Sequence, residues 1–285
     1  MNPSPHPIKS SASLASSPSP STTRAVRVGE VLVGGPLFVV MAGPCSIEGR
    51  EQFQQTAFHV RSHGACLLRG GMWKLRTSVQ SFQGLGSESL QFVSKVLSDS
   101  GMGFVSEITD PRQIEVLDDV VSLYQVGARN MFNYALLKEL GNTRKPVLLK
   151  RSFAAQVDEW IKAADYLTQG GNDQVILCER GIRSFEPSTR YTFDLNAVLI
   201  AKSRTHFPVV VDPSHAIGLR EHVPALTYAA AAAGADGVIV EVHPSPNTAL
   251  SDGRQSLDFQ QFEEMMLRLE KILMAIGRPL QRLEP

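Results

Sequence analysis

The sequence predicts an α/β protein, a (β/α)8 barrel (TIM barrel) preceded by a short β-hairpin. Eight short apolar runs recur at near-regular intervals along the 285 residues, and a helical pattern follows each of them. Almost every run also stops on a residue with a reactive or charged side chain. Barrels of this class place the C-terminal ends of their eight parallel strands at one mouth, where the active site lies. The fold prediction therefore also predicts where the chemistry lies.

Alternating and apolar runs predict the strands in chain order. Residues 26–28 and 31–33, around Gly29-Glu30, alternate like a hairpin that would close the bottom of the barrel. The barrel strands are predicted at 38–43, 65–68, 104–105, 123–126, 147–149, 175–178, 209–211 and 238–240.

Apolar residues at helical spacing predict a helix after each strand. Several of these segments end at glycine, and one opens with Asp110 as N-cap and Pro111 as first helical residue. The helical segments are one from 53 that Gly64 would end, one from 90 that stops before Gly101, the one opening at 110–111, and 131–140, 157–167, 192–202, 223–233 and 259–276. No long gap is left over, so residues 25–285 are predicted to form one catalytic domain.

Composition limits the classes of partner and compartment. Twenty-eight basic residues balance twenty-eight acidic ones, which gives no sign of a nucleic-acid or membrane partner. No uninterrupted apolar stretch approaches the roughly 20 residues that span a bilayer. Three cysteines, Cys45, Cys66 and Cys178, are too few for a disulfide framework in this chain. They indicate a reducing compartment, and we expect a cytoplasmic protein.

Residues 1–24 differ from the rest of the chain. They are rich in Ser and Pro and have no hydrophobic period, so we expect a disordered tail. The acid-poor composition also fits an organelle transit peptide, although Lys9 and Arg24 are its only strong positive charges.

Four residues from separate strand ends could bind one divalent metal ion. Cys45 follows the first barrel strand, His215 follows the seventh, Glu241 closes the eighth, and Asp252 lies in the loop after it. Mixed sulfur, nitrogen and oxygen ligands suit Mn²⁺, Fe²⁺, Co²⁺ or Zn²⁺ without choosing among them. From the residues alone, a structural role stays open, because a lone buried cysteine usually packs as a small hydrophobic residue.

A second set of strand-end residues is cationic, in a chain of zero net charge. Arginine presents a planar fork to phosphate and carboxylate oxygens, and barrel mouths are common phosphate sites. The number of these cations predicts two anionic substrates, or one with several charges. They are Arg69, Lys74, Arg76, Arg129, Lys150, Arg180 and Arg183.

Longer motifs give the chain a family resemblance. Residues 68–78 (LRGGMWKLRTS) and 81–86 (SFQGLG) resemble the signature loop of 3-deoxy-D-arabino-heptulosonate 7-phosphate (DAHP) synthases, most closely the shorter (beta) subgroup of type I. The resemblance extends over roughly residues 25–277. It includes GARN at 127–130, LLKR at 148–151, CERGIR at 178–183, DPSH at 212–215, VEVHP at 240–244 and LSDGRQS at 250–256.

The resemblance implies a transferase that condenses phosphoenolpyruvate with erythrose 4-phosphate to DAHP and phosphate, the first step of the shikimate pathway. It implies Cys45, His215, Glu241 and Asp252 as ligands of one divalent ion, with Mn²⁺ expected and Fe²⁺, Co²⁺ or Zn²⁺ as alternatives. It also implies a homodimer or homotetramer.

Substrate-binding and catalytic residues follow from the same resemblance. The phosphate of phosphoenolpyruvate would be held by Arg129, Lys150 and Arg180, and its carboxylate and reacting end would lie near Arg69 and Lys74. The phosphate of the sugar aldehyde would be held by Arg76, Thr77 and Ser78. Lys74 and His215 would handle protons, and Glu107 would orient the water that adds.

The signature loop departs from the family at two positions. The family normally reads Lys-Pro-Arg-Thr where this chain has Leu75, and Val79 replaces a second proline. Proline fixes φ at about −65°, so Leu75 could loosen the loop that carries Lys74 and Arg76. The ordinary substrate is our first expectation, and a different aldose phosphate stays open.

Two alternatives remain. A 3-deoxy-D-manno-octulosonate 8-phosphate synthase uses arabinose 5-phosphate and typically has Asn between the Lys and Arg of the loop, which this chain lacks. A non-catalytic homologue acting as a binding subunit would be expected to lose a metal ligand or a phosphate-binding arginine, and none is lost.

Overall fold

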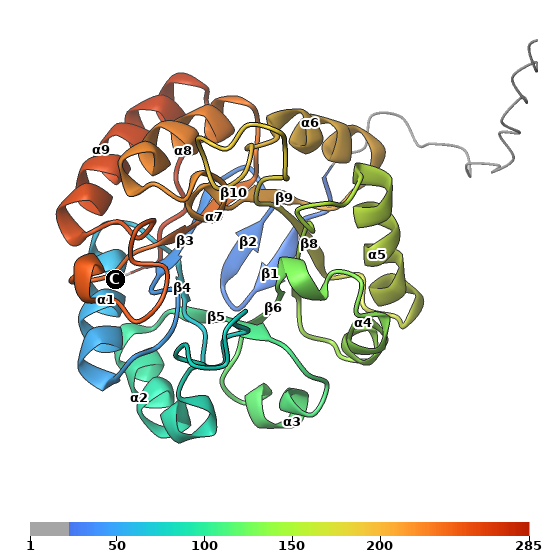
Figure 1. Cartoon of the computed structure of the whole chain (residues 1–285). Helices are drawn as coiled ribbons and strands as arrows, with labels where there is room; N and C mark the ends of the chain where they lie inside the picture. Colours follow the sequence, from blue (N-terminus) through green and yellow to red (C-terminus); the bar gives the residue numbers. More distant parts are fainter. Residues whose placement is uncertain (1–22, 285) are drawn as a thin grey trace, which may run out of the picture.

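Eight parallel strands close into a barrel, in the computed structural model that describes residues 23–284 (Figure 1). Around the barrel the strand order is β10-β3-β4-β5-β6-β7-β8-β9. The strands are β3 (Val39–Gly43), β4 (Leu67–Arg69), β5 (Gly103–Ile108), β6 (Leu123–Val126), β7 (Val147–Lys150), β8 (Val175–Glu179), β9 (Val209–Val211) and β10 (Gly237–Glu241). The predicted (β/α)8 barrel is confirmed.

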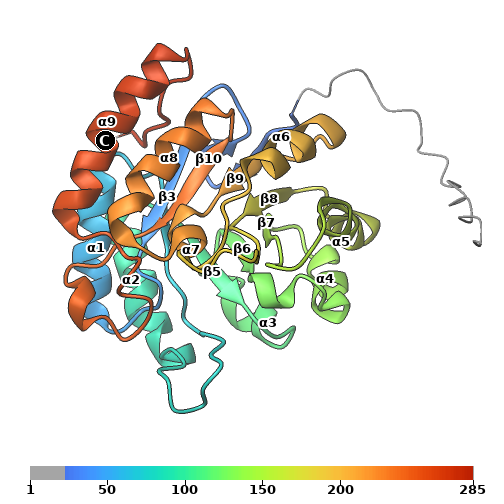
Figure 2. The ribbon, with the colours of Figure 1, turned by 45° about the horizontal axis from the view of Figure 1, so that its top comes forward.

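Helices form an outer ring around these strands (Figures 1 and 2). They are α1 (Arg50–Ser62), α2 (Leu90–Ser100), α3 (Gln113–Leu117), α4 (Tyr134–Gly141), α5 (Val157–Gln169), α6 (Leu195–Arg204), α8 (Val223–Ala232) and α9 (Phe259–Ala275). The short helix α7 (Pro213–Ile217) lies inside this ring, next to β10 (Figure 1). Short 3-10 turns occur at η1 (Gly86–Ser89), η2 (Ala128–Asn130), η3 (Arg220–His222) and η4 (Pro246–Thr248). The additional helix α7 directly follows β9 and was not predicted.

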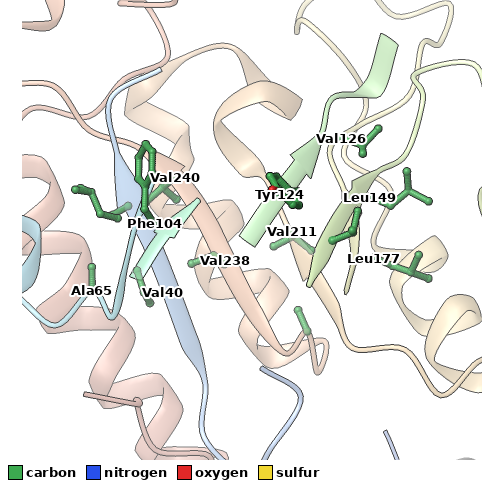
Figure 3. Close-up of a cluster of buried hydrophobic side chains, with 14 of the residues drawn as sticks. Val40, Ala65, Phe104, Tyr124, Val126, Leu149, Leu177, Val211, Val238 and Val240 are labelled. Atoms are coloured by element: carbon green, nitrogen blue, oxygen red, sulfur yellow. The ribbon is translucent and has the colours of Figure 1, made fainter. Parts of the chain in front are cut away.

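Alternation along each strand divides the core into two layers. In β3, Val40 and Ala42 belong to the layer between the barrel and the helices, part of which Figure 3 shows. Val39 and Met41 belong to the layer inside the barrel. Both layers are fully apolar at these positions, so the strands are buried on both faces, as in other parallel sheets.

The predicted hairpin is confirmed as β1 (Val26–Val28) and β2 (Val31–Val33), which pair antiparallel. Its four valines are at most 3% exposed and belong to the same cluster as the inward-facing strand residues. The hairpin therefore closes one end of the barrel interior, as expected.

Two predicted details are wrong. The carboxylate of Asp110 accepts the backbone N–H of Arg112 at 2.9 Å, which closes a tight turn, so α3 begins at Gln113 with Arg112 and not Asp110 as N-cap. Strand β5 also continues to Ile108, so Glu107 lies within the strand and not after it.

The predicted disordered tail, residues 1–24, lies outside the described residues apart from Thr23 and Arg24. Arg24 already contacts the barrel, because its backbone N–H donates to the carbonyl of His206 at 2.7 Å. Within residues 23–284, no helix is long and apolar enough to cross a membrane.

Candidate active site

A cavity of about 290 Å³ lies at the C-terminal ends of the barrel strands. Ten of the residues proposed for the site line it: Lys74, Arg76, Thr77, Ser78, Glu107, Arg129, Lys150, Arg180, His215 and Asp252. The predicted residues Arg69, Cys45 and Glu241 do not line it, but each contacts a residue of the site in the manner described below. The potential metal ligands and the cationic residues inferred from the sequence thus lie together at the C-terminal ends of the barrel strands.

Cys45, His215, Glu241 and Asp252 can offer ligand atoms that all lie within 4.8 Å of one another. The Cys45 thiol donates to Oδ2 of Asp252 at 3.0 Å. Nε2 of His215 lies 3.5 Å from Oε1 of Glu241 and 3.8 Å from Oδ2 of Asp252. Metal–ligand bonds of about 2.0–2.3 Å need donors at this spacing. The residues therefore fit a divalent ion.

Asp212 holds the imidazole of His215 in one tautomer. Its Oδ2 accepts Nδ1–H of His215 at 2.7 Å and also accepts from Nζ of Lys150 at 2.5 Å. The proton on Nδ1 leaves the lone pair of Nε2 facing Glu241 and Asp252. Burial lowers the pKa of His215 in spite of the nearby carboxylates, so the ring is neutral, as a metal ligand must be.

The two carboxylates of the quartet are ionised although they are buried. Burial raises the pKa of Glu241, but the positive charge of Arg69 acts against burial, and the net shift is downward. Arg69 donates from Nη1 to Oε1 of Glu241 at 3.0 Å and to the carbonyl of Pro44 at 2.7 Å. For Asp252, the charge of Lys74 and the hydrogen bond from Cys45 act against burial in the same way, and the pKa lies well below its usual range.

The thiol of Cys45 is protonated in this arrangement. Burial raises its pKa strongly, and the charge of Glu241 adds to the effect. Metal binding requires the thiolate, so binding should release this proton and become stronger as pH rises.

Two arginines that line the cavity each have a buried N–H group without a partner in residues 23–284. Nη1 of Arg180 and Nη1 of Arg76 are buried without a hydrogen-bond partner among the described residues. Arg180 is 4% exposed, and its guanidinium stacks on the ring of Tyr191 at 4.1 Å. A buried N–H without a partner costs about 1–3 kcal/mol, more when it is charged. This cost would be removed by an anion in the cavity.

Lys74 lies between the potential metal-binding quartet and the cationic residues of the cavity. Its Nζ is 3.6 Å from Oδ2 of Asp252, and the side chain is 9% exposed. Burial lowers the pKa of Lys74, but the negative charges of Glu107 and Asp252 act against burial, and the net shift is upward. The amine is therefore an ammonium that can donate a proton.

The geometry places Glu107 tightly against β6. A Cβ at Gly127, the residue after that strand, would lie 2.0 Å from Oε1 of Glu107. Gly127 has φ −65° and ψ 155°, so the backbone needs no glycine there and the carboxylate of Glu107 is the reason for one. The absence of a side chain at 127 lets Glu107 enter the cavity wall.

One predicted cation is not brought into the cavity. The guanidinium of Arg183 lies 4.4 Å from the ring centroid of Phe153 and does not line the cavity. Sequence reasoning also missed the lining residues Gln125, Phe153, Arg190 and Tyr191, and the supporting residue Asp212. Of these residues, only Asp212 could have been found from the local sequence. An Asp-Pro pair often begins a helix, and the residue three positions after the Asp, here His215, then lies beside the Asp carboxylate.

Comparison with known proteins decides the family. A model of the DAHP synthetase I family matches residues 15–276. The chain belongs to the DAHP synthetase I family. A phospho-2-dehydro-3-deoxyheptonate aldolase of Thermotoga maritima is 45% identical over 252 residues, which cover 88% of this chain and 75% of that protein. A 2-dehydro-3-deoxyphosphooctonate aldolase of Desulfatibacillum aliphaticivorans is 31% identical and is covered to 92% by the match, which spans 83% of this chain.

Solved structures agree with this membership in the DAHP synthetase I family. The crystal structure of the Thermotoga maritima DAHP synthase superimposes with a TM-score of 0.88 at 43% identity, covering 92% of this chain and 76% of that one. A truncated form of the Thermotoga maritima enzyme gives a TM-score of 0.85 at 41% identity, covering 92% and 96%.

Proposed function

We propose that this protein is a DAHP synthase, a transferase that condenses phosphoenolpyruvate with erythrose 4-phosphate to DAHP and inorganic phosphate in the shikimate pathway. The proposal rests on one cavity whose wall includes His215 and Asp252 of the potential metal-binding quartet and two buried arginine N–H groups without a partner in the part of the chain that the structure describes, on Arg76 and Arg180. The 45% identical Thermotoga maritima relative bears the corresponding name. The signature motifs favour the beta subgroup of type I.

In this proposal the phosphate of phosphoenolpyruvate binds to Arg129, Lys150 and Arg180. Arg180 has a free N–H for it, and Arg129 is exposed to the cavity and bonded only weakly, at 3.4 Å, to the carbonyl of Leu75. Arg69 and Lys74 lie toward the carboxylate and the reacting carbon. Fixing this substrate against the aldehyde turns a bimolecular encounter into an oriented attack.

The phosphate of the sugar aldehyde would bind to Arg76, Thr77 and Ser78. These residues line the same cavity, and Nη1 of Arg76 is buried and unpaired. Two separate sets of donors match two anionic substrates, which is one of the two alternatives that the number of cations at the strand ends predicts.

A divalent ion would be held by Cys45, His215, Glu241 and Asp252, and we propose Mn²⁺, with Fe²⁺, Co²⁺ and Zn²⁺ as alternatives for the same donor set. When bound, such an ion supplies Lewis-acid polarisation of a carbonyl oxygen. Oδ2 of Asp212 keeps His215 oriented for this role.

Proton transfer falls to the chain's own residues. Lys74 is charged and adjacent to Asp252, so it can donate a proton to the developing alkoxide. His215 is a second candidate for proton transfer. Glu107, held in the cavity wall by Gly127, can accept a hydrogen bond from the water that adds to phosphoenolpyruvate.

Octulosonate synthesis is the second candidate, because relatives of that name are 31% identical and this chain lacks the family's proline at Leu75. We further propose a homodimer or homotetramer in the cytoplasm. The three buried free thiols support a reducing compartment. Light scattering on the purified protein measures the oligomeric state.

The test is a steady-state assay with erythrose 4-phosphate and arabinose 5-phosphate side by side. We expect phosphate release from phosphoenolpyruvate with erythrose 4-phosphate, loss of activity with a chelator, and recovery on adding Mn²⁺. A preference for arabinose 5-phosphate would favour the octulosonate reaction. No phosphate release with either sugar would contradict both and favour a binding subunit.

A further inference from the structure

Arg190 connects the β8–α6 loop to the β10–α9 loop. Its Nη1 donates to Oε1 of Gln255 at 2.6 Å and to Oδ1 of Asp252 at 3.4 Å. The two loops are more than sixty residues apart in the chain. The guanidinium lines the cavity, although nothing in the sequence marked it as part of the site.

Gln255 extends this connection to a second carboxylate. The side chain is 2% exposed, and its Nε2 donates to Oε2 of Glu241 at 2.6 Å. Its amide oxygen accepts from Arg190 while its amide nitrogen donates to Glu241, so both ends of the amide are used. We call Arg190 and Gln255 the carboxylate clamp.

The carboxylate clamp takes one oxygen of each acid and leaves the other. Oδ1 of Asp252 faces Arg190, while Oδ2 lies 3.0 Å from the thiol of Cys45 and 3.8 Å from Nε2 of His215. Oε2 of Glu241 faces Gln255, while Oε1 lies 3.5 Å from Nε2 of His215. The clamp thus contacts one oxygen of each acid, and the other oxygen lies near Nε2 of His215; in Glu241 this other oxygen also accepts from Arg69 at 3.0 Å.

The clamp is also fixed to the helix that carries His215. The backbone N–H groups of Arg190 and Tyr191 donate to the carbonyls of Ile217 and Ala216 in α7, at 3.1 and 2.9 Å. Gly218, which ends this helix at φ 71°, packs so closely that a Cβ there would lie 2.7 Å from Cβ of Arg190. These contacts hold Arg190 against α7 and therefore in a constant position relative to His215, a third residue of the quartet.

The backbone at Asp252 explains why a clamp is needed. Asp252 has φ 48°, and it is the only residue other than glycine with positive φ in the described part of the chain. A non-glycine residue in this conformation is strained, and it persists only when its surroundings hold it. Contacts to Arg190 supply part of that restraint.

We propose that Arg190 and Gln255 are positioning residues of the metal site, which set the affinity for the divalent ion by orienting Asp252 and Glu241. This inference rests on the proposed metal site. Partners that orient metal ligands typically contribute about 10- to 100-fold to metal affinity. Neither residue touches the reacting atoms in this role.

The experiment measures Mn²⁺ binding to the full-length, metal-free protein without substrate, by electron paramagnetic resonance of free Mn²⁺. The variants are Arg190→Met, Gln255→Met and the double variant, with Cys45→Ser as the loss-of-site reference. The control is Arg220→Met, because Arg220 also tethers the β10–α9 loop, through Nη2 to Asn247 at 2.7 Å, but touches neither acid. A second readout is the absorption of the Co²⁺-loaded protein, which reports the ligand geometry.

We expect each clamp variant to weaken Mn²⁺ binding by about 10- to 100-fold and to shift the Co²⁺ spectrum. The double variant should lose little more than one single variant, because both residues act through one connection. Arg220→Met should bind Mn²⁺ as the wild type does. If Arg190→Met does not fold, Gln255→Met and Arg190→Lys carry the test, and Arg190→Lys should weaken binding because an ammonium cannot bond both partners as the fork does.

Wild-type affinity in Gln255→Met and in the foldable Arg190 variant would overturn the inference while leaving the metal site intact. A raised KM for the aldose phosphate with unchanged Mn²⁺ affinity would also overturn it and would make Arg190 a substrate ligand. If the wild-type protein binds no Mn²⁺, or if Cys45→Ser binds as well as wild type, the proposed metal site itself is wrong.

Discussion

The carboxylate of Asp212 accepts Nδ1–H of His215 at 2.7 Å, and this bond determines which nitrogen of the ring faces the metal-binding quartet. The two residues are three positions apart on the first turn of α7, where Asp212 is also the N-cap and accepts the backbone N–H of His215 at 2.9 Å. A short, unpredicted helix therefore fixes both the position and the tautomer of a proposed ligand.

Replacing Asp212 with Asn should weaken Mn²⁺ binding by about 10- to 100-fold, since the amide can present its N–H to Nδ1 and favour the wrong tautomer. The measurement is isothermal titration calorimetry on the metal-free protein. Asp258→Asn is the control, because Asp258 is also an N-cap, on α9, and Asn caps a helix equally well. Equal Mn²⁺ affinity in Asp212→Asn and wild type would contradict the role of this bond.

Replacing Gly127 with Ala should displace the carboxylate of Glu107, because the new Cβ would lie 2.0 Å from its Oε1. Misplacing a group by about 1 Å can cost roughly 100-fold in rate, so we expect kcat to fall by about 10- to 100-fold. The same replacement in a Glu107→Ala background should have little further effect. Additive losses in the two backgrounds would show that Gly127 acts on something other than Glu107.

The ring of Tyr191 supports Arg180, with the guanidinium carbon 4.1 Å from the ring centroid. A cation–π contact of this kind is worth about 0.5–2 kcal/mol, so Tyr191→Leu should raise KM for phosphoenolpyruvate by about 2- to 30-fold. Tyr191→Phe keeps the ring and should stay near wild type. If Phe and Leu raise KM equally, the hydroxyl and not the ring face supports Arg180.

Burial raises the pKa of Cys66 from 9.0 to about 12. Between these values the unfolded chain loses the thiol proton while the folded chain keeps it, so the unfolded state binds fewer protons. The free energy of unfolding should then fall as pH rises from 9 toward 12. Urea titrations across this range should give a shallower decline for Cys66→Ala than for the wild type. Identical slopes would mean that the thiol titrates equally in both states.

Much of the fold could be predicted from the sequence because burial on both faces makes each barrel strand a plain apolar run. The bounds of β6 and β9, and both strands of the hairpin, match the prediction. Asp110 was misplaced because the same residue type that caps helices also closes tight turns, and only the contact with Arg112 distinguishes the two. The local sequence pattern is the same for a helix N-cap and for a tight turn, so it cannot distinguish the two.

From the sequence, only those site residues could be predicted that lie at or just after the end of a strand. Cys45, His215 and Glu241 follow strands that meet at one mouth, so the topology brings them together. Arg190 and Gln255 lie in long loops, and their contact depends on how two loops pack, which no periodicity records. Arg183 is the opposite case. It closely follows a strand, but its guanidinium packs on the ring of Phe153 and does not line the cavity.

The most direct measurement is anomalous diffraction from crystals grown with Mn²⁺ and phosphoenolpyruvate. We expect one anomalous peak bonded to Sγ of Cys45, Nε2 of His215 and the carboxylates of Glu241 and Asp252, with the substrate phosphate against Arg180 in the same cavity. A peak at another site, or an ordered substrate away from Arg180, would contradict this expectation.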